Sequence, residues 1–186
     1  THTGQFAANG NANLETTATL NNQARLQAGK TIALTATALD NASAGEIVAT
    51  TTQLKATDSH TLTNRGLIDG ADTFIDSATV NNLGTGRIYG DHVAIAATSL
   101  TNAAETVSGV TSAPVIAARD RLDIGATTID NREHGLLFSA ADISIGGALD
   151  ANHRATGRAG TLNNASATIE ALGNLALNVG EINNTN

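Results

Sequence analysis

The chain has 186 residues and no Cys, which excludes disulfides and thiolate metal sites. A net charge of −7 argues against a nucleic-acid partner, because nucleic-acid binding depends on Lys and Arg that neutralise phosphates. The chain contains no run of about 18 apolar residues, so no membrane-spanning helix is predicted.

A triplet made of an aliphatic residue, a polar residue and Asn recurs along the whole chain. Its eight copies are Leu20-Asn21-Asn22, Leu39-Asp40-Asn41, Leu62-Thr63-Asn64, Val80-Asn81-Asn82, Leu100-Thr101-Asn102, Ile129-Asp130-Asn131, Leu162-Asn163-Asn164 and Ile182-Asn183-Asn184. Their first residues lie 19, 23, 18, 20, 29, 33 and 20 positions apart. A unit of about 20 residues cannot close a core of its own and must stack on its copies. The spacing therefore predicts a solenoid.

Two further segments recur between the triplets. The first begins with Gly or Ala and has an aliphatic residue at its centre; in chain order its copies occupy residues 4–8, 24–28, 45–49, 66–70, 86–90, 135–139 and 167–171. The second carries apolar residues in a short alternating pattern, at 32–34, 74–75, 93–95, 122–124, 143–145 and 175–177. Period-two alternation predicts strands with one face in and one face out.

Three short strands per unit predict an all-β fold, a parallel β-helix of about eight coils in which residues 1–186 form a single repeat segment. Successive coils lie about 4.8 Å apart and pair their strands in parallel. Inward Leu, Ile and Val fill a narrow core. Such a core has little room for rings, in agreement with three Phe, one Tyr and no Trp.

The Asn at the third triplet position is present in every copy. We expect a structural ladder in which side-chain amides hydrogen-bond from coil to coil, and Asn also tolerates the left-handed backbone of a tight corner. A calcium-binding array is the alternative, but calcium sites need converging carboxylates. The ladder consists of Asn22, Asn41, Asn64, Asn82, Asn102, Asn131, Asn164 and Asn184.

The repeat spacing is interrupted by two insertions, near residues 103–115 and 147–160. Insertions in solenoids form loops on one face, often a binding face. The second insertion supplies the candidate partner-binding residues Asp150, His153, Arg154 and Arg158. The alternative is that loop length drifts because long loops cost little free energy, and that His153 and Arg154 form a solvated tip.

Carboxylates cluster in two places, at Asp69, Asp72 and Asp76 and at Asp120, Asp123 and Asp130. A carboxylate pair on one outer face could cleave glycosidic bonds. Turn-like positions account for these Asp residues equally well, so we predict no catalytic site. The five histidines are widely spaced and are expected to face solvent, so we predict no metal site and no cofactor; they are His2, His60, His92, His134 and His153.

The order and number of these segments resemble the haemagglutinin repeats of large secreted bacterial proteins. Residues 147–152, 155–159, 161–164 and 167–175 carry the resemblance most clearly, and it covers essentially the whole chain. The families concerned are the filamentous haemagglutinins and the contact-dependent growth-inhibition toxins. The resemblance implies a right-handed β-helix that passes an outer-membrane two-partner secretion transporter and is displayed on a Gram-negative cell.

Taken together, the sequence and the resemblance predict a stalk segment of a large secreted adhesin or toxin-delivery filament. An adhesive module is the first alternative; it would use the insertion loops or a sheet face to bind a receptor or glycan on a host or a neighbouring bacterium. A polysaccharide-cleaving β-helix enzyme is the second. The family's secretion and toxin domains are not found in these 186 residues.

Overall fold

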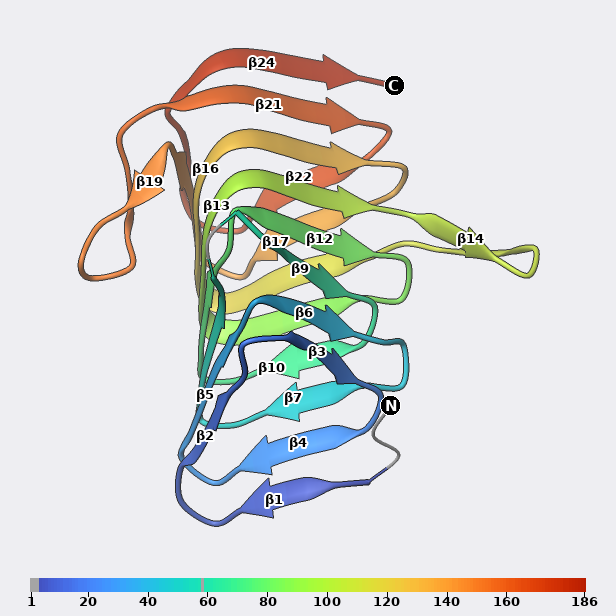
Figure 1. The fold of residues 1–186 in the computed structure, drawn as a ribbon. Helices are drawn as coiled ribbons and strands as arrows, with labels where there is room; N and C mark the ends of the chain where they lie inside the picture. The colour runs from blue at the N-terminus through green and yellow to red at the C-terminus, as the bar shows by residue number, and fades with distance from the viewer. Residues whose placement is uncertain (1–3, 58) are drawn as a thin grey trace.

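The computed structural model describes residues 4–57 and 59–186, and these residues contain strands but no helix. The strands wind around one core as a right-handed parallel β-helix (Figure 1). Each coil contributes a strand to each of three long faces, which we call face 1, face 2 and face 3. The predicted fold class is confirmed.

Face 1 begins each coil and consists of β1 (Phe6–Ala8), β4 (Arg25–Ala28), β7 (Glu46–Val48), β10 (Leu67–Asp69), the first parts of β13 (Arg87–Ala103) and β16 (Val115–Arg132), β17 (Leu136–Ser139) and β22 (Thr168–Ala171). Face 2 consists of β2 (Ala12–Glu15), β5 (Thr31–Ala36), β8 (Thr51–Ala56), β11 (Asp72–Asp76), the middle parts of β13 and β16, β18 (Asp142–Gly146) and β23 (Leu175–Leu177). Face 3 consists of β3 (Thr19–Asn22), β6 (Ala38–Asn41), β9 (Thr61–Asn64), β12 (Thr79–Leu83), the last parts of β13 and β16, β21 (Ala159–Ala165) and β24 (Val179–Thr185).

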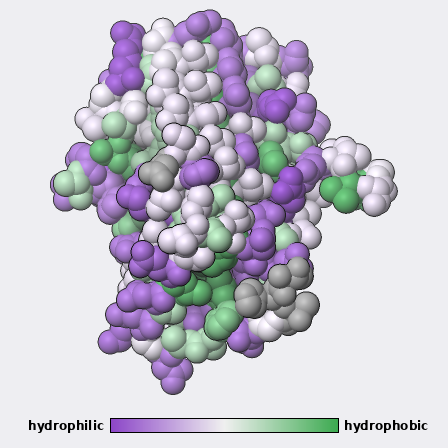
Figure 2. All heavy atoms as spheres, in the orientation of Figure 1, coloured by the Kyte–Doolittle hydropathy of each residue, from purple (hydrophilic) through white to green (hydrophobic). Residues whose placement is uncertain are grey.

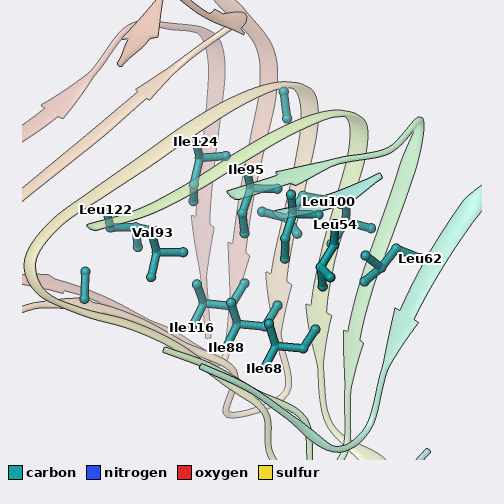
Figure 3. Packing of buried hydrophobic residues seen from close by; sticks show 14 of the residues in the cluster. Leu54, Leu62, Ile68, Ile88, Val93, Ile95, Leu100, Ile116, Leu122 and Ile124 are labelled. Atoms are coloured by element: carbon teal, nitrogen blue, oxygen red, sulfur yellow. The ribbon is translucent and has the colours of Figure 1, made fainter. Parts of the chain in front are cut away.

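The core is a set of aliphatic rows that run along the coil axis. Ile68, Ile88 and Ile116 stack from face 1, and Ile95 and Ile124 from face 2 (Figure 3). These side chains are fully buried because strand alternation turns every second residue inward. Burial of one such side chain stabilises the fold by about 1.5–3 kcal/mol. Stability therefore accumulates coil by coil.

In the middle coils, aromatic side chains point away from the core, as expected. Phe74, Tyr89 and Phe138 occupy outward positions of their strands, next to buried aliphatic neighbours. Phe6 aligns with the inward Leu26, but it belongs to the first coil and is 51% exposed. The interior is filled mainly by Leu, Ile, Val and Ala, together with a few small polar side chains and the Asn row described next.

The eight triplet Asn side chains lie in one row at the corner after face 3. In each step the Nδ2 of one Asn donates to the Oδ1 of the next, over 2.7–2.9 Å, from Asn22 through to Asn184. From Asn22 to Asn131 the same nitrogen also donates to a carbonyl in the face 1 strand that follows the next Asn of the row, for example Asn82 to Val115 at 3.1 Å. The row is thus a continuous polar spine in an apolar core.

None of these Asn residues has the left-handed backbone expected from corner chemistry, because all of them lie in strands with negative φ. Their amide hydrogen bonds account for the motif on their own. The corner instead relies on glycine. A Cβ on Gly45 or Gly86 would lie 2.3 Å from the Oδ1 of Asn41 or Asn82, so the Gly that opens the face 1 segment makes room for the spine.

Two antiparallel hairpins leave the coil at the predicted insertions (Figure 1). The first, β14 (Glu105–Val107) and β15 (Val110–Ser112), projects from the corner between faces 3 and 1. The second, β19 (Ala148–Leu149) and β20 (Ala155–Thr156), is carried by residues 147–160, which we call the strap. The two hairpins lie on opposite sides of the rod.

Candidate functional site: a strap across face 2

The strap lies against the outer surface of face 2 and does not project into solvent. It packs on β13, β16 and β18, where the outward positions are occupied by small residues such as Ala94, Gly125 and Gly146. A Cβ on Gly125 would lie 2.3 Å from the carbonyl carbon of Ala148, and one on Gly146 would lie 2.5 Å from the Thr156 oxygen. Two glycines therefore permit the strap to touch the sheet backbone.

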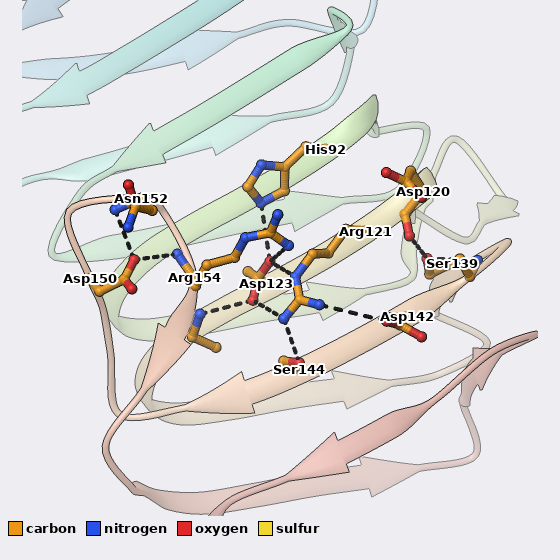
Figure 4. A network of polar contacts seen from close by, with 12 residues as sticks. His92, Asp120, Arg121, Asp123, Ser139, Asp142, Ser144, Asp150, Asn152 and Arg154 are labelled. Carbon is orange, nitrogen blue, oxygen red and sulfur yellow. Dashed lines mark hydrogen bonds and ion pairs between the residues drawn. The ribbon is translucent and has the colours of Figure 1, made fainter.

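Asp123 fastens the strap to the sheet. It occupies an outward position of β16, yet its exposed fraction is 0% because the strap covers it. Its Oδ1 accepts the Ala155 N–H of the strap at 2.8 Å, and its Oδ2 accepts Arg121 Nε at 2.6 Å and lies 3.1 Å from His92 Nε2 (Figure 4). Arg154 Nη1 of the strap lies 3.8 Å from the same carboxylate.

These contacts keep Asp123 ionised. Burial alone would raise the pKa of this carboxyl group, but hydrogen bonds from His92, Arg121 and the Ala155 amide outweigh the burial and lower its pKa to about 2. The carboxylate is therefore an anion at neutral pH, enclosed by donors from two coils and from the strap. A carboxylate enclosed in this way anchors a loop and cannot reach a substrate.

Arg121 extends the network to the next coil. Its Nη2 donates to Ser144 Oγ at 3.0 Å, and its Nη1 lies 3.7 Å from Asp142 (Figure 4). The backbone and side-chain N–H groups of Asn174 donate to Asp142 at 2.8 and 3.0 Å and lower the pKa of that carboxyl group. Polar contacts thus connect four successive coils on face 2, those containing His92, Arg121, Asp142 and Asn174.

The tip of the strap is also ordered by contacts within the chain. Asp150 Oδ1 accepts the backbone N–H groups of Asn152 and Arg154, each at 2.8 Å. His153 has a left-handed backbone, with φ of 58°, and stacks on Phe74 with the ring centroids 3.8 Å apart. Phe74 in turn meets His92 edge to face at 5.5 Å.

The four residues proposed from the sequence as a partner-binding loop therefore have intramolecular roles. Asp150 stabilises the turn, His153 stacks on the sheet, Arg154 approaches Asp123, and Arg158 Nε donates to the Val179 carbonyl at 3.2 Å. The solvated tip expected as the alternative is wrong for His153, because the loop returns to face 2. Arg154 keeps about half of its side chain exposed, at 48%.

The tip of the strap borders a groove of about 400 Å³ on face 2. Outward Ala33 and Gln53 contribute to its floor, and Leu149 and the stacked Phe74 and His153 form its wall. Four polar residues also line it, Thr35, Gln53, Lys55 and Asp76. Lys55 and Asp76 form an ion pair at 3.3 Å.

This groove was not predicted from the sequence. Phe74 is in register with Gln53, and Asp76 with Lys55, so an alignment of the face 2 strands would have placed these outward pairs side by side. The wall contributed by His153 could not be found in this way. It comes from an insertion far along the chain whose direction local patterns do not specify.

The carboxylate clusters seen in the sequence are dispersed in the structure. Asp69 lies on face 1, near Arg119 at 3.8 Å, whereas Asp72 and Asp76 lie on face 2. The second cluster is split as well; Asp130 lies on face 3, where it accepts a hydrogen bond from Asn163 at 2.6 Å. Asp123 meets Asp142 through Arg121 and does not meet its sequence neighbours Asp120 and Asp130.

The histidines differ in environment. His92 was expected to face solvent, but it lies beside Asp123 with only 17% of its side chain exposed. His134 lies in a corner with a left-handed backbone, His60 is exposed, and His2 lies outside the described residues. Within residues 4–57 and 59–186, no group of three His, Asp or Glu residues is arranged to hold a metal ion.

The first hairpin presents an apolar tip. Val107 and Val110 flank its two-residue turn and are 62% and 66% exposed. The projecting tip carries hydrophobic, green surface at the right of Figure 2. At its base, Arg65 donates to both oxygens of Glu105, at 2.7 and 2.9 Å. This pair holds the hairpin to the preceding coils.

Comparisons with known proteins identify no relative: no family model, no curated protein and no solved structure matches this chain. In the part of the chain that the structure describes, no helix is long and apolar enough to cross a membrane.

Proposed function

We propose that this chain is a rigid spacer segment of a longer β-solenoid filament. The observation that carries the proposal is that, among the residues that the structure describes, both end coils leave core side chains exposed. At the N-terminal end, a hollow of about 270 Å³ is lined by inward residues that include Leu14, Leu20 and Leu26. At the C-terminal end, Leu175 and Ile182 are 48% and 51% exposed, although their partners Ile143 and Leu162 are buried.

Open coil ends favour further stacking. Each end exposes apolar side chains together with unpaired strand edges, and an adjoining coil would cover both. An interior coil needs no partner besides the two adjacent coils, because its strands pair with theirs in all three faces. A segment of this kind extends a rod by a fixed length per coil, which is the property required of a spacer.

The haemagglutinin-like repeat order supports a place for this filament on the surface of a Gram-negative cell, as part of a large adhesin or a contact-dependent inhibition toxin. Export would pass through an outer-membrane two-partner secretion transporter. Coils with contacts only to their neighbours can form one after another as the chain emerges, each on the edge of the previous coil. The lack of Cys removes any risk of wrong disulfides outside the cell.

The test is to remove whole coils. Deletion of residues 23–64 removes two coils and joins Asn22 to the corner that begins at Arg65, and both corners place two residues between Asn and the next strand. We expect the shortened protein to keep its β-sheet circular dichroism and cooperative melting. Its length in small-angle X-ray scattering should fall by about 10 Å, at about 4.8 Å per coil.

The same deletion made in the exported parent protein tests the biological role. A spacer that has lost two coils should still display whatever lies beyond it on the cell surface. If the shortened protein folds but the distal region loses its activity altogether, the segment has a specific role and the spacer proposal is wrong.

Carboxylate-based polysaccharide cleavage is not part of this proposal, because Asp123 is enclosed by the strap and the remaining clusters are divided between faces. The adhesive alternative is favoured by one observation, the groove beside the strap.

A further inference from the structure

The groove on face 2 has a wall that is fixed before any ligand arrives. The strap that forms it is held by the Ala155 amide on Asp123 and by the His153–Phe74 stack. Its volume of about 400 Å³ falls in the usual range for small-ligand sites. We propose that this groove binds a neutral oligosaccharide that lies along the coil axis. This proposal is independent of the spacer function proposed above, because a rod of fixed length can also carry a ligand site on its outer face.

The lining combines apolar surface with hydrogen-bonding groups. Phe74, His153 and Leu149 offer an apolar wall, and Ala33 offers a flat floor, whereas Ala94 is buried under the strap. The Gln53 amide and the Thr35 hydroxyl lie in the same groove, and neither has a hydrogen-bond partner among the described residues. A sugar ring has an apolar C–H face and a rim of hydroxyl groups, so it matches both kinds of surface.

The direction of the ligand follows from the repeat. The outward residues Ala33, Gln53, Phe74 and Ala94 form one column across four coils, with a step of about 4.8 Å. A linear chain of rings along the open part of this column would meet Ala33 and Gln53, one outward side chain per coil, and would end against Phe74, because Ala94 is buried. The strap closes the column at its C-terminal end, where Leu149 and His153 rise from the sheet.

Charge disfavours an anionic ligand. Lys55 is the only Lys or Arg among the residues that line the groove, and it is already paired with Asp76 at 3.3 Å. The whole chain carries a net charge of −7. A phosphate or uronate group would therefore find no unpaired positive charge in the groove, whereas a neutral sugar avoids this cost.

The test is an NMR titration of the intact protein with cellohexaose, maltohexaose, xylohexaose, chitohexaose and, as an anionic probe, hexagalacturonate. We expect at least one neutral hexasaccharide to bind and to shift the ring resonances of Phe74 and His153. Phe74→Ala and His153→Asn should each weaken binding by about tenfold or more, because each removes half of the stacked wall.

Matched controls lie elsewhere on the rod. Phe138→Ala removes an outward ring from face 1, and His134→Asn changes another left-handed His. Both should leave binding unchanged. Should Phe74→Ala fail to fold, Gln53→Ala replaces it, since that side chain is exposed on β8. The proposal is overturned if no neutral hexasaccharide binds at millimolar concentration, if hexagalacturonate binds best, or if the control variants lose binding equally.

Discussion

At the scale of the residue, the repeated Asn decides how the coils hold together. An amide has both a donor and an acceptor, so identical side chains can bond to one another in an endless row, which neither Asp nor Leu can do. From Asn22 to Asn131 each Asn is buried, and the amide of an internal Asn such as Asn82 is satisfied by the coils on either side. The motif is therefore required by burial and does not depend on a left-handed corner.

Replacement of one internal Asn should be costly. Asn82→Ala removes the acceptor of Asn64 Nδ2 and the donors to Asn102 Oδ1 and the Val115 carbonyl. We expect the free energy of unfolding to fall by about 2–4 kcal/mol, because buried polar groups lose their partners. Asn184→Ala, at the exposed end of the row, should cost less than about 0.5 kcal/mol. Equal losses in urea unfolding would show that the ladder does not stabilise the fold.

At the scale of the element, the strap differs from the first hairpin. The hairpin projects and exposes its tip, whereas the strap returns to the sheet over two glycines and a buried carboxylate. This difference determines which residues can be deleted to remove each loop without damage to the coil. Ala103 and Ala159 are buried in β13 and β21, so removal of all of residues 103–115 and 147–160 would damage the coil. Deletion of residues 105–112 would remove the first hairpin, and deletion of residues 148–158 would remove the strap, while both buried Ala residues stay in place.

The anchor of the strap predicts a pH dependence. The pKa of Asp123 is lowered to about 2 in the folded state, below its value in the unfolded chain. Its stabilising effect, about 2 kcal/mol, is therefore complete above about pH 4 and is lost as the pH falls towards 2. Thermal melting should show wild type more stable than Asp123→Asn at pH 6, with the gap closing near pH 2.

The exposed pair of Asp91 with Arg119 provides the control for this experiment. Asp91→Asn should change melting little at any pH, because surface ion pairs contribute little. A constant gap between wild type and Asp123→Asn from pH 6 to pH 2 would contradict the role given to the ionised anchor.

At the scale of the whole molecule, the described residues leave the core of the rod open at both ends. Apolar rows that are fully buried in the middle coils become half exposed at β1 and β24. Contacts between such ends are head to tail and do not close into a ring, so they generate filaments. The isolated chain should thus associate through its ends at high concentration.

A charge placed at one end tests this expectation. Ile182→Lys puts an ammonium group on the open C-terminal coil and should shift sedimentation towards the monomer, because burial of the charge would be costly. Val110→Lys, at another exposed apolar position, on the hairpin tip, should leave association unchanged. Loss of association in Val110→Lys alone would place the contact at the hairpin.

The sequence by itself determined the class of fold, the three-strand coil and the alignment of most inward rows. These follow from local alternation and from a motif repeated every coil. The sequence patterns did not predict the face 2 strands of the first and third coils, β2 and β8. In β8, the inward Thr52 interrupts the apolar pattern, and its hydroxyl group donates to the Asp69 carbonyl at 3.0 Å.

Only the tertiary structure decided which outward side chains are covered and where the outer surface forms a groove. Alternation assigns Asp123 to an outward position, and so predicts exposure, yet a loop that begins 24 residues later buries it. The groove depends on the same return, because His153 reaches Phe74 across several coils. Strand periodicity specifies which side of the sheet a residue occupies, but the path of an insertion is set by long-range packing that no local pattern records.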